Sequence, residues 1–472
     1  MESNFHKYLV PGLDVFVSDP EILNPFEETK RRADFLYIPK EYVDRAADFE
    51  GEQSARGDAC GVLLDYFIFI NQKINHSDQD FFELPNGTKV FLVEPKNYFG
   101  FDPKDFMTSS KRQAISLARH LVEERIASAS DVAIYTGSRK LAGPASVRNI
   151  DVAQVNPEVY TGRRRVKLPF ELSHLWFSNH RVSKNEWEDF FPDEAPLKIN
   201  EFIEFVSDSP ILTGNRLDSI GRFDAEENAL IPLRYKALTT NKNPARIFPR
   251  NPGQAMLVEA LQTPPTILPM VVCLGIYGTG KTFLATGAGY LGTLSEDYDH
   301  VFVCPRDGAL GAEIGFVPGD TTEKTRVKAR PIEDNLREIL KIMNHDQKKR
   351  GTALKSQVEQ TLKEYFEFEP LINMGGRSLS DMFLIFDEFQ DTERYQATAL
   401  LSRLGNNTKA IALGDPFQTT NPHLGPTSNG LSYSASRLAG KPEAAVITLF
   451  PEEIERSDAT RAIASYFTSP RS

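Results

Sequence analysis

The sequence has few cysteines and no long apolar run. Its three cysteines, Cys60, Cys273 and Cys304, lie far apart in 472 residues and are odd in number. We therefore expect neither a disulfide framework nor a zinc site, and we expect a reducing, cytoplasmic location. No apolar stretch is long enough to cross a bilayer, so no membrane partner is expected. The first residues also lack the charged start and apolar core of a signal peptide.

Basic residues are in the minority. The chain has 54 Lys and Arg against 65 Asp and Glu, a net charge of −11, which argues against a protein coated in basic surface. A local groove for nucleic acid is still compatible with this balance, because such binding depends on the local potential. The length exceeds that of one ordinary core, and about 100–200 residues per domain predicts two to four domains.

Patterning divides the chain into three predicted domains, at 1–166, 167–246 and 247–472. In the first, short apolar runs alternate with helical segments, which predicts an α/β domain. Its expected strands are 8–17, 35–38, 89–94 and 131–135, and its expected helices are 58–72 and 109–127.

The second region is predicted to be a small β-rich connecting domain. Its strand-like pieces, 201–206 and 229–235, are separated by Pro, Asn, Asp and Gly. The basic run 163–165 leads into it. A run of this length is typical of solvated surface, and contact with nucleic acid is the weaker alternative.

The third region has the pattern of a parallel sheet wrapped by helices. Helical stretches alternate with apolar strands expected at 267–274, 301–304, 382–386 and 410–413. In such α/β folds, the loops at the carboxyl ends of the strands carry the chemistry. The charged segment 344–368 is predicted to be helical and to form an inserted hairpin or arm.

A glycine-rich stretch organises this third region. Residues 275–282 have the spacing G-x-x-x-x-G-K-[ST] between a predicted strand and a predicted helix, the context of a phosphate-binding loop. Backbone N–H groups and the helix N-terminus would hold phosphate, Lys281 would reach the β- and γ-phosphates, and the Thr282 hydroxyl would bind Mg²⁺. The alternative is a glycine-rich turn that matches by chance. The candidate nucleotide-binding residues here are Gly275, Gly278, Thr279, Gly280, Lys281 and Thr282.

Two further strand ends supply polar groups. Asp387 and Glu388 follow the strand 382–386, so Asp387 would bind Mg²⁺ and Glu388 would polarise the attacking water. Gln418, after the strand 410–413 and Asp415, would sense the γ-phosphate. The alternatives are an exposed acidic turn and an ordinary polar loop. Gln254 precedes the phosphate loop, and two alternatives for it are equally favoured: it binds the adenine edge, or it is a first-turn helix residue.

At this point the chain resembles the PhoH-like ATPases, relatives of superfamily one helicases. The resemblance covers 247–467 and rests on six blocks in order, at 249–254, 278–282, 315–320, 376–381, 387–390 and 414–418. The sequence departs from the family pattern at two places. Arg306 lies one place out of register with the arginine of the family's Thr-Arg-Pro block, and Thr420 stands where the family has an aspartate. The resemblance implies ATP hydrolysis with Mg²⁺, action on RNA or single-stranded nucleic acid, and ring-shaped homo-oligomers such as hexamers. Arg456 and Arg461 are candidate arginine fingers, in cis or in trans, or surface helix residues.

Through the stretches 9–21, 53–67, 131–152 and 159–162, the first region resembles the PIN nuclease domain. The whole chain therefore looks like a PIN–PhoH fusion. Such nucleases hold divalent metal with clustered carboxylates. In this chain Gly12 stands where the family has an aspartate in its first strand, and Asp14 lies two places later. Ser138 stands where the family has an aspartate after the strand 131–135. Asp44 is only a loose candidate for the acid that the family has on a helix. We therefore expect a PIN-like scaffold without nuclease activity. The leading function is an ATP-driven RNA remodeller or helicase-like motor. The competing functions are an ATP-regulated assembly module and an active ribonuclease powered by the ATPase.

Overall fold

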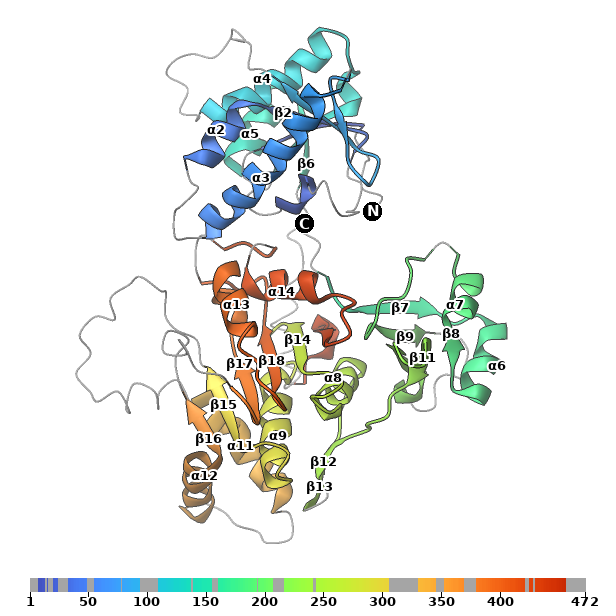
Figure 1. The fold of residues 1–472 in the computed structure, drawn as a ribbon, viewed down its shortest axis with the longest axis vertical. Helices are drawn as coiled ribbons and strands as arrows, with labels where there is room; N and C mark the ends of the chain where they lie inside the picture. The colour runs from blue at the N-terminus through green and yellow to red at the C-terminus, as the bar shows by residue number, and fades with distance from the viewer. Residues whose placement is uncertain are drawn as a thin grey trace, which may run out of the picture. The chain divides into compact units, whose positions relative to one another are not determined.

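The structure is a computed structural model of the 472-residue chain. It describes residues 7–12, 15, 20–23, 33–48, 55–77, 79–93, 109–136, 139–154, 160–192, 194–206, 216–240, 243–304, 330–344, 352–368, 379–420, 424–427 and 429–455. The chain forms two compact units, Met1–Glu158 with Pro422–Ser428, and Val159–Asn421 with Asn429–Ser472 (Figure 1). Within the described residues, no helix has both the length and the apolar character to cross a membrane.

The first unit contains a six-stranded sheet in the order β3-β4-β2-β1-β5-β6. Its strands are β1 (Tyr8–Pro11), β2 (Phe35–Pro39), β3 (Phe82–Glu83), β4 (Lys89–Val93), β5 (Val132–Thr136) and β6 (Asp151–Gln154). Its helices are α2 (Glu41–Ala47), α3 (Ala55–Asn75), α4 (Ser109–Glu123) and α5 (Arg139–Val147). All neighbouring strands are parallel except β3, which is antiparallel to β4. The predicted α/β architecture is confirmed.

Successive strand residues explain why helices cover both faces of this sheet. Leu9 and Val10 point to opposite faces, because side chains alternate along a strand. Leu9 packs in one buried cluster with Phe67 of α3, and Val10 packs in another with Ile115 of α4. A strand buried on both sides needs helices on both sides, which is the α/β arrangement that the pattern predicted.

The second unit begins with a five-stranded sheet in the order β7-β9-β10-β11-β8. Its strands are β7 (Arg163–Lys167), β8 (Val182–Ser183), β9 (Phe202–Val206), β10 (Ile220–Asp224) and β11 (Ala229–Pro232), joined by α6 (Phe170–Asn179) and α7 (Lys184–Phe190). Strand β7 pairs in parallel with β9 from Arg163 to Lys167, so the sheet begins before the predicted boundary at residue 166. We call this sheet with α6 and α7 the connector.

The remainder of the second unit is a mostly helix-covered parallel sheet. The hairpin β12 (Leu238–Thr240) and β13 (Asn243–Ile247) leads into it. Its strand order is β16-β15-β17-β18-β14-β19, with every neighbouring pair parallel. The strands are β14 (Met270–Gly275), β15 (His300–Cys304), β16 (Phe366–Phe368), β17 (Met382–Phe386), β18 (Lys409–Gly414) and β19 (Ala444–Leu449). The helices are α8 (Pro252–Gln262), α9 (Lys281–Leu294), α11 (Arg330–Met343), α12 (Thr352–Tyr365), α13 (Arg394–Leu401) and α14 (Gly430–Leu438).

Both faces of this sheet are buried. Val271 and Cys273 belong to the cluster formed with α8, α9 and α11, and Val272 belongs to the cluster formed with α13 and α14. Cys273 and Cys304 are free and buried in these two different clusters. The predicted strands around the phosphate loop are therefore confirmed as a doubly covered parallel sheet, consistent with a P-loop fold.

The segment 344–368 was predicted to be helical and to form an inserted hairpin or arm; its described part contains a helix, as predicted, but this helix packs into the domain and does not project as an arm. Helix α12 packs against α11 through Leu354 and Val358, which lie in the main cluster of the domain. The chain then enters β16, which forms an edge of the sheet beside β15. Leu354 and Val358 lie at i and i+4 and so share one face of α12, whereas the basic run 348–350 lies outside the described residues.

Helix α8 has an unusual C-terminal anchor. The ammonium of Lys409, at the start of β18, is fully buried and donates hydrogen bonds to the carbonyls of Ala260, Thr263 and Leu268 at 2.6, 2.8 and 2.5 Å. The last carbonyls of a helix have no partners inside the helix, and a cation there also matches the helix dipole. Burial lowers the pKa of Lys409 well below its ordinary value, although Glu259 opposes the shift.

Candidate nucleotide-binding site

The phosphate loop joins the end of β14 to the start of α9. Gly275 closes the strand, and Lys281 is the first residue of the helix. Gly278 and Gly280 have φ values of 86° and 92°, a conformation that side chains other than glycine rarely adopt. A Cβ at position 280 would also lie 2.9 Å from Nε2 of Gln254. The strand, loop and helix predicted from the sequence are therefore present at these residues.

Lys281 is folded onto its own loop. Its ammonium donates to the carbonyls of Gly275 and Ile276 at 2.5 and 2.9 Å, and the side chain is almost fully buried. Burial lowers the pKa of Lys281, while the charges of Asp415, Asp387 and Glu388 oppose the shift. An entering phosphate would offer this ammonium a charged acceptor, which makes a stronger hydrogen bond than a neutral carbonyl does.

Asp387 and Glu388 follow β17 directly, as predicted. Removal from water and the neighbouring Glu388 raise the pKa of Asp387 to about 6, while Lys281 and the Thr282 hydroxyl lower it. Oδ1 of Asp387 accepts the N–H of Glu388 at 3.0 Å. Glu388 itself has a φ of 55°, in the left-handed region, which a residue with a side chain occupies only at a cost. Such outliers are concentrated at functional sites.

The loop after β18 brings a third carboxylate. Asp415 is buried, which raises its pKa, while hydrogen bonds from the Phe417 N–H and the Gln418 side chain oppose the shift. Its Oδ2 has no hydrogen-bond partner among the described residues. Gln418 itself is exposed at the surface of this loop. The charges of Asp387, Glu388 and Asp415 thus all act on Lys281, and this local excess of negative charge is compatible with a divalent cation.

The donor set matches Mg²⁺ better than zinc. Mg²⁺ in phosphoryl-transfer sites is held by one or two carboxylates, a hydroxyl and the phosphates of the substrate, rather than by an all-protein cage. Asp387 and Thr282 are hydrogen-bonded to each other and would supply the protein's two ligands. Among the described residues, no group of three or more His, Cys, Asp or Glu side chains is arranged to hold a metal ion.

Gln390 links the two acidic loops, and the sequence analysis did not single it out. Its Nε2 donates to Oε2 of Glu388 at 2.6 Å and to the Gln418 carbonyl at 3.3 Å, while its Oε1 accepts the Asp415 N–H at 3.2 Å. A Cβ at Gly414 would lie 1.9 Å from Oε1 of Gln390, so a side chain there would displace the Gln390 amide. The available signal was its position in the block 387–390.

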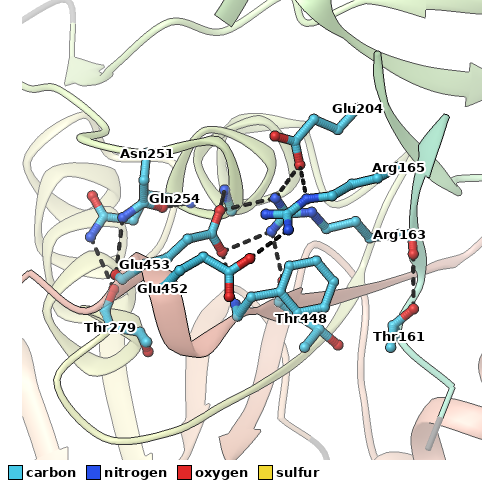
Figure 2. Close-up of polar contacts among 12 residues, drawn as sticks. Thr161, Arg163, Arg165, Glu204, Asn251, Gln254, Thr279, Thr448, Glu452 and Glu453 are labelled. Atoms are coloured by element: carbon cyan, nitrogen blue, oxygen red, sulfur yellow. Dashed lines mark hydrogen bonds and ion pairs between the residues drawn. The ribbon is translucent and has the colours of Figure 1, made fainter. Parts of the chain in front are cut away.

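Gln254 lies against the phosphate loop, with both ends of its amide bonded to backbone. Nε2 donates to the Thr279 carbonyl at 2.9 Å (Figure 2). Oε1 accepts the Arg250 N–H at 2.9 Å. The side chain is buried. Of the two alternatives that the sequence left open, the adenine contact and a first-turn helix residue, this arrangement favours the second, since Gln254 lies in the first turn of α8 with its amide bonded to backbone. Thr279 in turn donates its hydroxyl to the Ile276 carbonyl at 2.8 Å.

Several predicted residues lie outside the described part of the chain. These are Asp14, Ser138, Arg306, the block 315–320, residues 376–378, Arg456 and Arg461. Glu455, the last described residue, donates its N–H to the Gly278 carbonyl at 3.1 Å. Thr420, where the resembled family has an aspartate, donates to both carboxylate oxygens of Asp391.

Of the candidate nuclease acids of the first unit, Asp44 lies in the described part and Asp14 does not. Gly12 follows β1 and donates its N–H to the Tyr135 carbonyl at 2.8 Å. Asp44 is exposed on α2, where the neighbouring Arg45 pairs with Glu41 and Asp48. The resemblance of this unit to the PIN domain therefore stays a prediction.

Comparison with known proteins identifies the second unit's parallel-sheet domain. Residues 246–468 match the family model described as PhoH-like protein. Protein PhoH2 of Bacillus subtilis is 29% identical over 305 residues, 63% of this chain and 62% of that protein. A PhoH-like protein of Synechocystis sp. is 34% identical over 152 residues, 32% of this chain and 42% of that protein. Protein PhoH2 of Mycolicibacterium smegmatis is 31% identical over 186 residues, 39% of each chain.

The chain thus spans about three fifths of the length of the Bacillus PhoH2 that it matches, and less of the other two. The matched residues, 246–468, agree with the range 247–467 over which the sequence resembled the PhoH-like proteins. They also contain the phosphate loop and both acidic strand ends. The C-terminal region of this protein, residues 246–468, is a PhoH-family domain.

Proposed function

We propose that this protein binds ATP with Mg²⁺ at the phosphate loop and hydrolyses it. The observation that carries the proposal is the meeting of Lys281 and Thr282 at the start of α9 with Asp387 and Glu388 at the end of β17. Phosphoryl transfer needs little covalent chemistry from a protein; it needs positioning and charge stabilisation, which these four side chains supply.

Each side chain has a role that follows from its position. Lys281 would leave the loop carbonyls for the terminal phosphates and stabilise the charge that develops on them. Asp387 and Thr282 would hold Mg²⁺, which withdraws charge from the phosphoryl oxygens when bound. Glu388, fixed by the hydrogen bond from Gln390 at 2.6 Å, would orient and polarise the attacking water. Gln418 would report the state of the γ-phosphate through Asp415.

We also propose that hydrolysis is coupled to RNA or another single-stranded nucleic acid. Two exposed aromatic rings support this partner: Tyr277 in the phosphate loop is 50% exposed, and Phe417 after β18 is 65% exposed. Aromatic rings that follow neighbouring strands can stack on unpaired bases without sequence preference. A ring-shaped homo-oligomer in which a second subunit completes the site is part of the same proposal, with Arg456 or Arg461 as its arginine finger.

The test is ATP hydrolysis by the purified protein alone, with single-stranded RNA and with single-stranded DNA. Hydrolysis that rises with nucleic acid and falls in Phe417→Ala supports the coupled function. Hydrolysis that neither nucleic acid changes would favour an ATP-regulated assembly module. An absence of both ATP binding and hydrolysis would overturn the proposed site itself.

A further inference from the structure

An arginine of the connector is buried against the segment that follows β19. Arg163, on β7, has a fully buried side chain, and its guanidinium forms a two-pronged ion pair with Glu453 at 2.8 and 2.9 Å (Figure 2). The same guanidinium donates to Glu204 of β9 and to the Thr448 carbonyl. It also lies 4.4 Å from the centroid of the Phe450 ring. This residue belongs to the basic run expected at the solvated surface, so that expectation is wrong for Arg163.

Glu453 carries the contact to the start of α8. Its Oε1 accepts the Gly253 N–H at 2.8 Å, and its Oε2 accepts the Phe450 N–H at 2.8 Å. The Asn251 amide donates to the Glu453 carbonyl at 3.2 Å. A carboxylate at a helix N-terminus satisfies N–H groups that have no partner inside the helix and matches the helix dipole. A Cβ at Gly253 would lie 2.5 Å from Oε2 of Glu453 and 3.0 Å from Arg163, so the ion pair requires glycine there.

The first turn of α8 then reaches the phosphate loop. Asn251 caps the helix by accepting the Gln254 N–H at 2.9 Å, and the Gln254 amide holds the Thr279 carbonyl. Glu455, two residues after Glu453, donates to the Gly278 carbonyl. Two routes therefore run from the Arg163–Glu453 pair to adjacent peptide groups of the loop, one through Gln254 and one through Glu455.

The ion pairs around Arg163 favour the charged form of the buried Glu204 carboxylate. Burial alone would raise the pKa of Glu204, but hydrogen bonds from Arg163 and Arg165 hold it below its ordinary value. Arg165 extends the pairing to Glu452 at 2.5 Å. A buried ion pair contributes little net stability but is costly to break on one side, because the remaining charge is left without a partner. The pair therefore fixes position more than it adds stability.

We propose that Arg163 is a positioning residue for ATP hydrolysis, by which the connector sets the geometry of the phosphate loop through Glu453 and the first turn of α8. The inference rests on the proposed ATPase function. Neither Arg163 nor Glu453 is among the residues proposed to bind the nucleotide; both would act through Gln254 and the loop backbone. A partner that shifts β7 or β9 would change ATP turnover through the same contacts.

Arg164 provides a matched control on the same strand. Its side chain is on the other face of β7 and pairs within the connector, donating to the Ala195 carbonyl at 2.7 Å and to Glu201 at 2.8 Å. Arg163→Lys keeps the charge but loses the two-pronged geometry, and Glu453→Gln keeps the shape but loses the charge. We expect each to lower kcat/KM for ATP by about tenfold, because small misplacements of catalytic groups cost up to roughly 100-fold. Arg164→Lys should change it by less than about twofold.

Two readouts separate positioning from general destabilisation. The effects of Arg163→Lys and Gln254→Leu on kcat/KM should be strongly non-additive, since both act on one route, whereas Arg164→Lys and Gln254→Leu should add. In nucleotide-free protein, Arg163→Lys should speed hydrogen exchange in a peptide covering 275–281 without changing exchange in β17. Arg164→Lys should leave both unchanged. This second readout needs no ATPase activity.

The outcomes are distinct. Parent protein that neither binds nor hydrolyses ATP would overturn the proposed function, and the exchange measurement would still test the inference. Active parent protein with additive double variants and unchanged loop exchange in Arg163→Lys would overturn the inference alone. If Arg163→Lys fails to fold, Glu453→Gln carries the same two tests, with Glu201→Gln as its control within the connector.

Discussion

Glu388→Gln tests the division of roles between the two carboxylates after β17. The substitution keeps the size of the side chain and an oxygen that can accept the hydrogen bond from Gln390, so the left-handed turn at this position should persist. It removes the charge that would polarise water. It also removes the negative charge of Glu388, which is the second largest cause of the raised pKa of Asp387, behind the burial of Asp387 itself.

The expected magnitudes follow from these two losses. Loss of a positioned general base costs roughly 10²–10⁴ in rate, so hydrolysis should fall by about that factor. Binding of ATP with Mg²⁺ should stay within about threefold at neutral pH, since Asp387 and Lys281 remain. In the parent, where burial and Glu388 raise the pKa of Asp387 to about 6, we expect Asp387 to take up a proton as the pH falls through that value. A protonated carboxyl does not bind Mg²⁺, so binding should weaken below that pH. In Glu388→Gln this loss should move to lower pH, because a neighbouring negative charge no longer opposes ionisation.

Phosphate release measures the rate, and titration calorimetry of ATP with Mg²⁺ from pH 5 to 8 measures the binding. Parent and variant should differ in rate at pH 7.5 and in the midpoint of the binding profile. A variant that hydrolyses ATP at the parent rate would refute the role of Glu388. A variant that loses ATP binding at pH 7.5 would show that Glu388 is a ligand or a structural residue. An unchanged midpoint would refute the coupling of the two carboxylates.

Three further predictions concern other parts of the chain. Lys281→Ala should lower ATP turnover by ~10²–10³, because the loop loses its mobile positive charge; turnover equal to the parent's would reject the site. Lys409→Met leaves three buried carbonyls without a donor and should lower the free energy of unfolding by about 3 kcal/mol. The exposed Lys441→Met should change it by less than about 0.5 kcal/mol, and denaturant titration compares the two. The full-length protein should not cut single-stranded RNA in Mg²⁺ or Mn²⁺; cleavage that disappears in Asp14→Asn would restore the nuclease reading.

Local pattern was enough to predict the sheet and the phosphate loop. The strand before Gly275 and the helix from Lys281 follow from apolar runs and glycine spacing within a few residues. The roles of Gln254 and Arg163 were not accessible in this way. Gln254 meets the Thr279 carbonyl across 25 positions, and Arg163 meets Glu453 across 290. A short basic run reads as surface unless the partners that bury it are known, and those partners are fixed by tertiary packing.

The predicted arm at 344–368 shows the opposite error. The many charged residues of this segment predict exposure to solvent. Leu354 and Val358 nevertheless form a narrow apolar stripe that packs into the core, and the charged residues of the segment are more numerous than these two. Gln390 was passed over for a related reason: a glutamine after two acids has no distinctive local signal. Its value comes from three hydrogen bonds to two different loops, which exist only once β17 and β18 lie side by side.

Helix α8 is fastened at both ends. Asn251 and Glu453 bind its first turn, and Lys409 binds the carbonyls around its last turn. Every residue from Pro252 to Leu261 is buried. Because both ends of the helix are hydrogen-bonded to other segments, neither end should unfold locally. Its amide hydrogens should therefore exchange with solvent only when the whole domain unfolds. Helix α8 would then move as a rigid body, so a displacement of the start of β18 would be transmitted to the phosphate loop, and a displacement of the loop to β18.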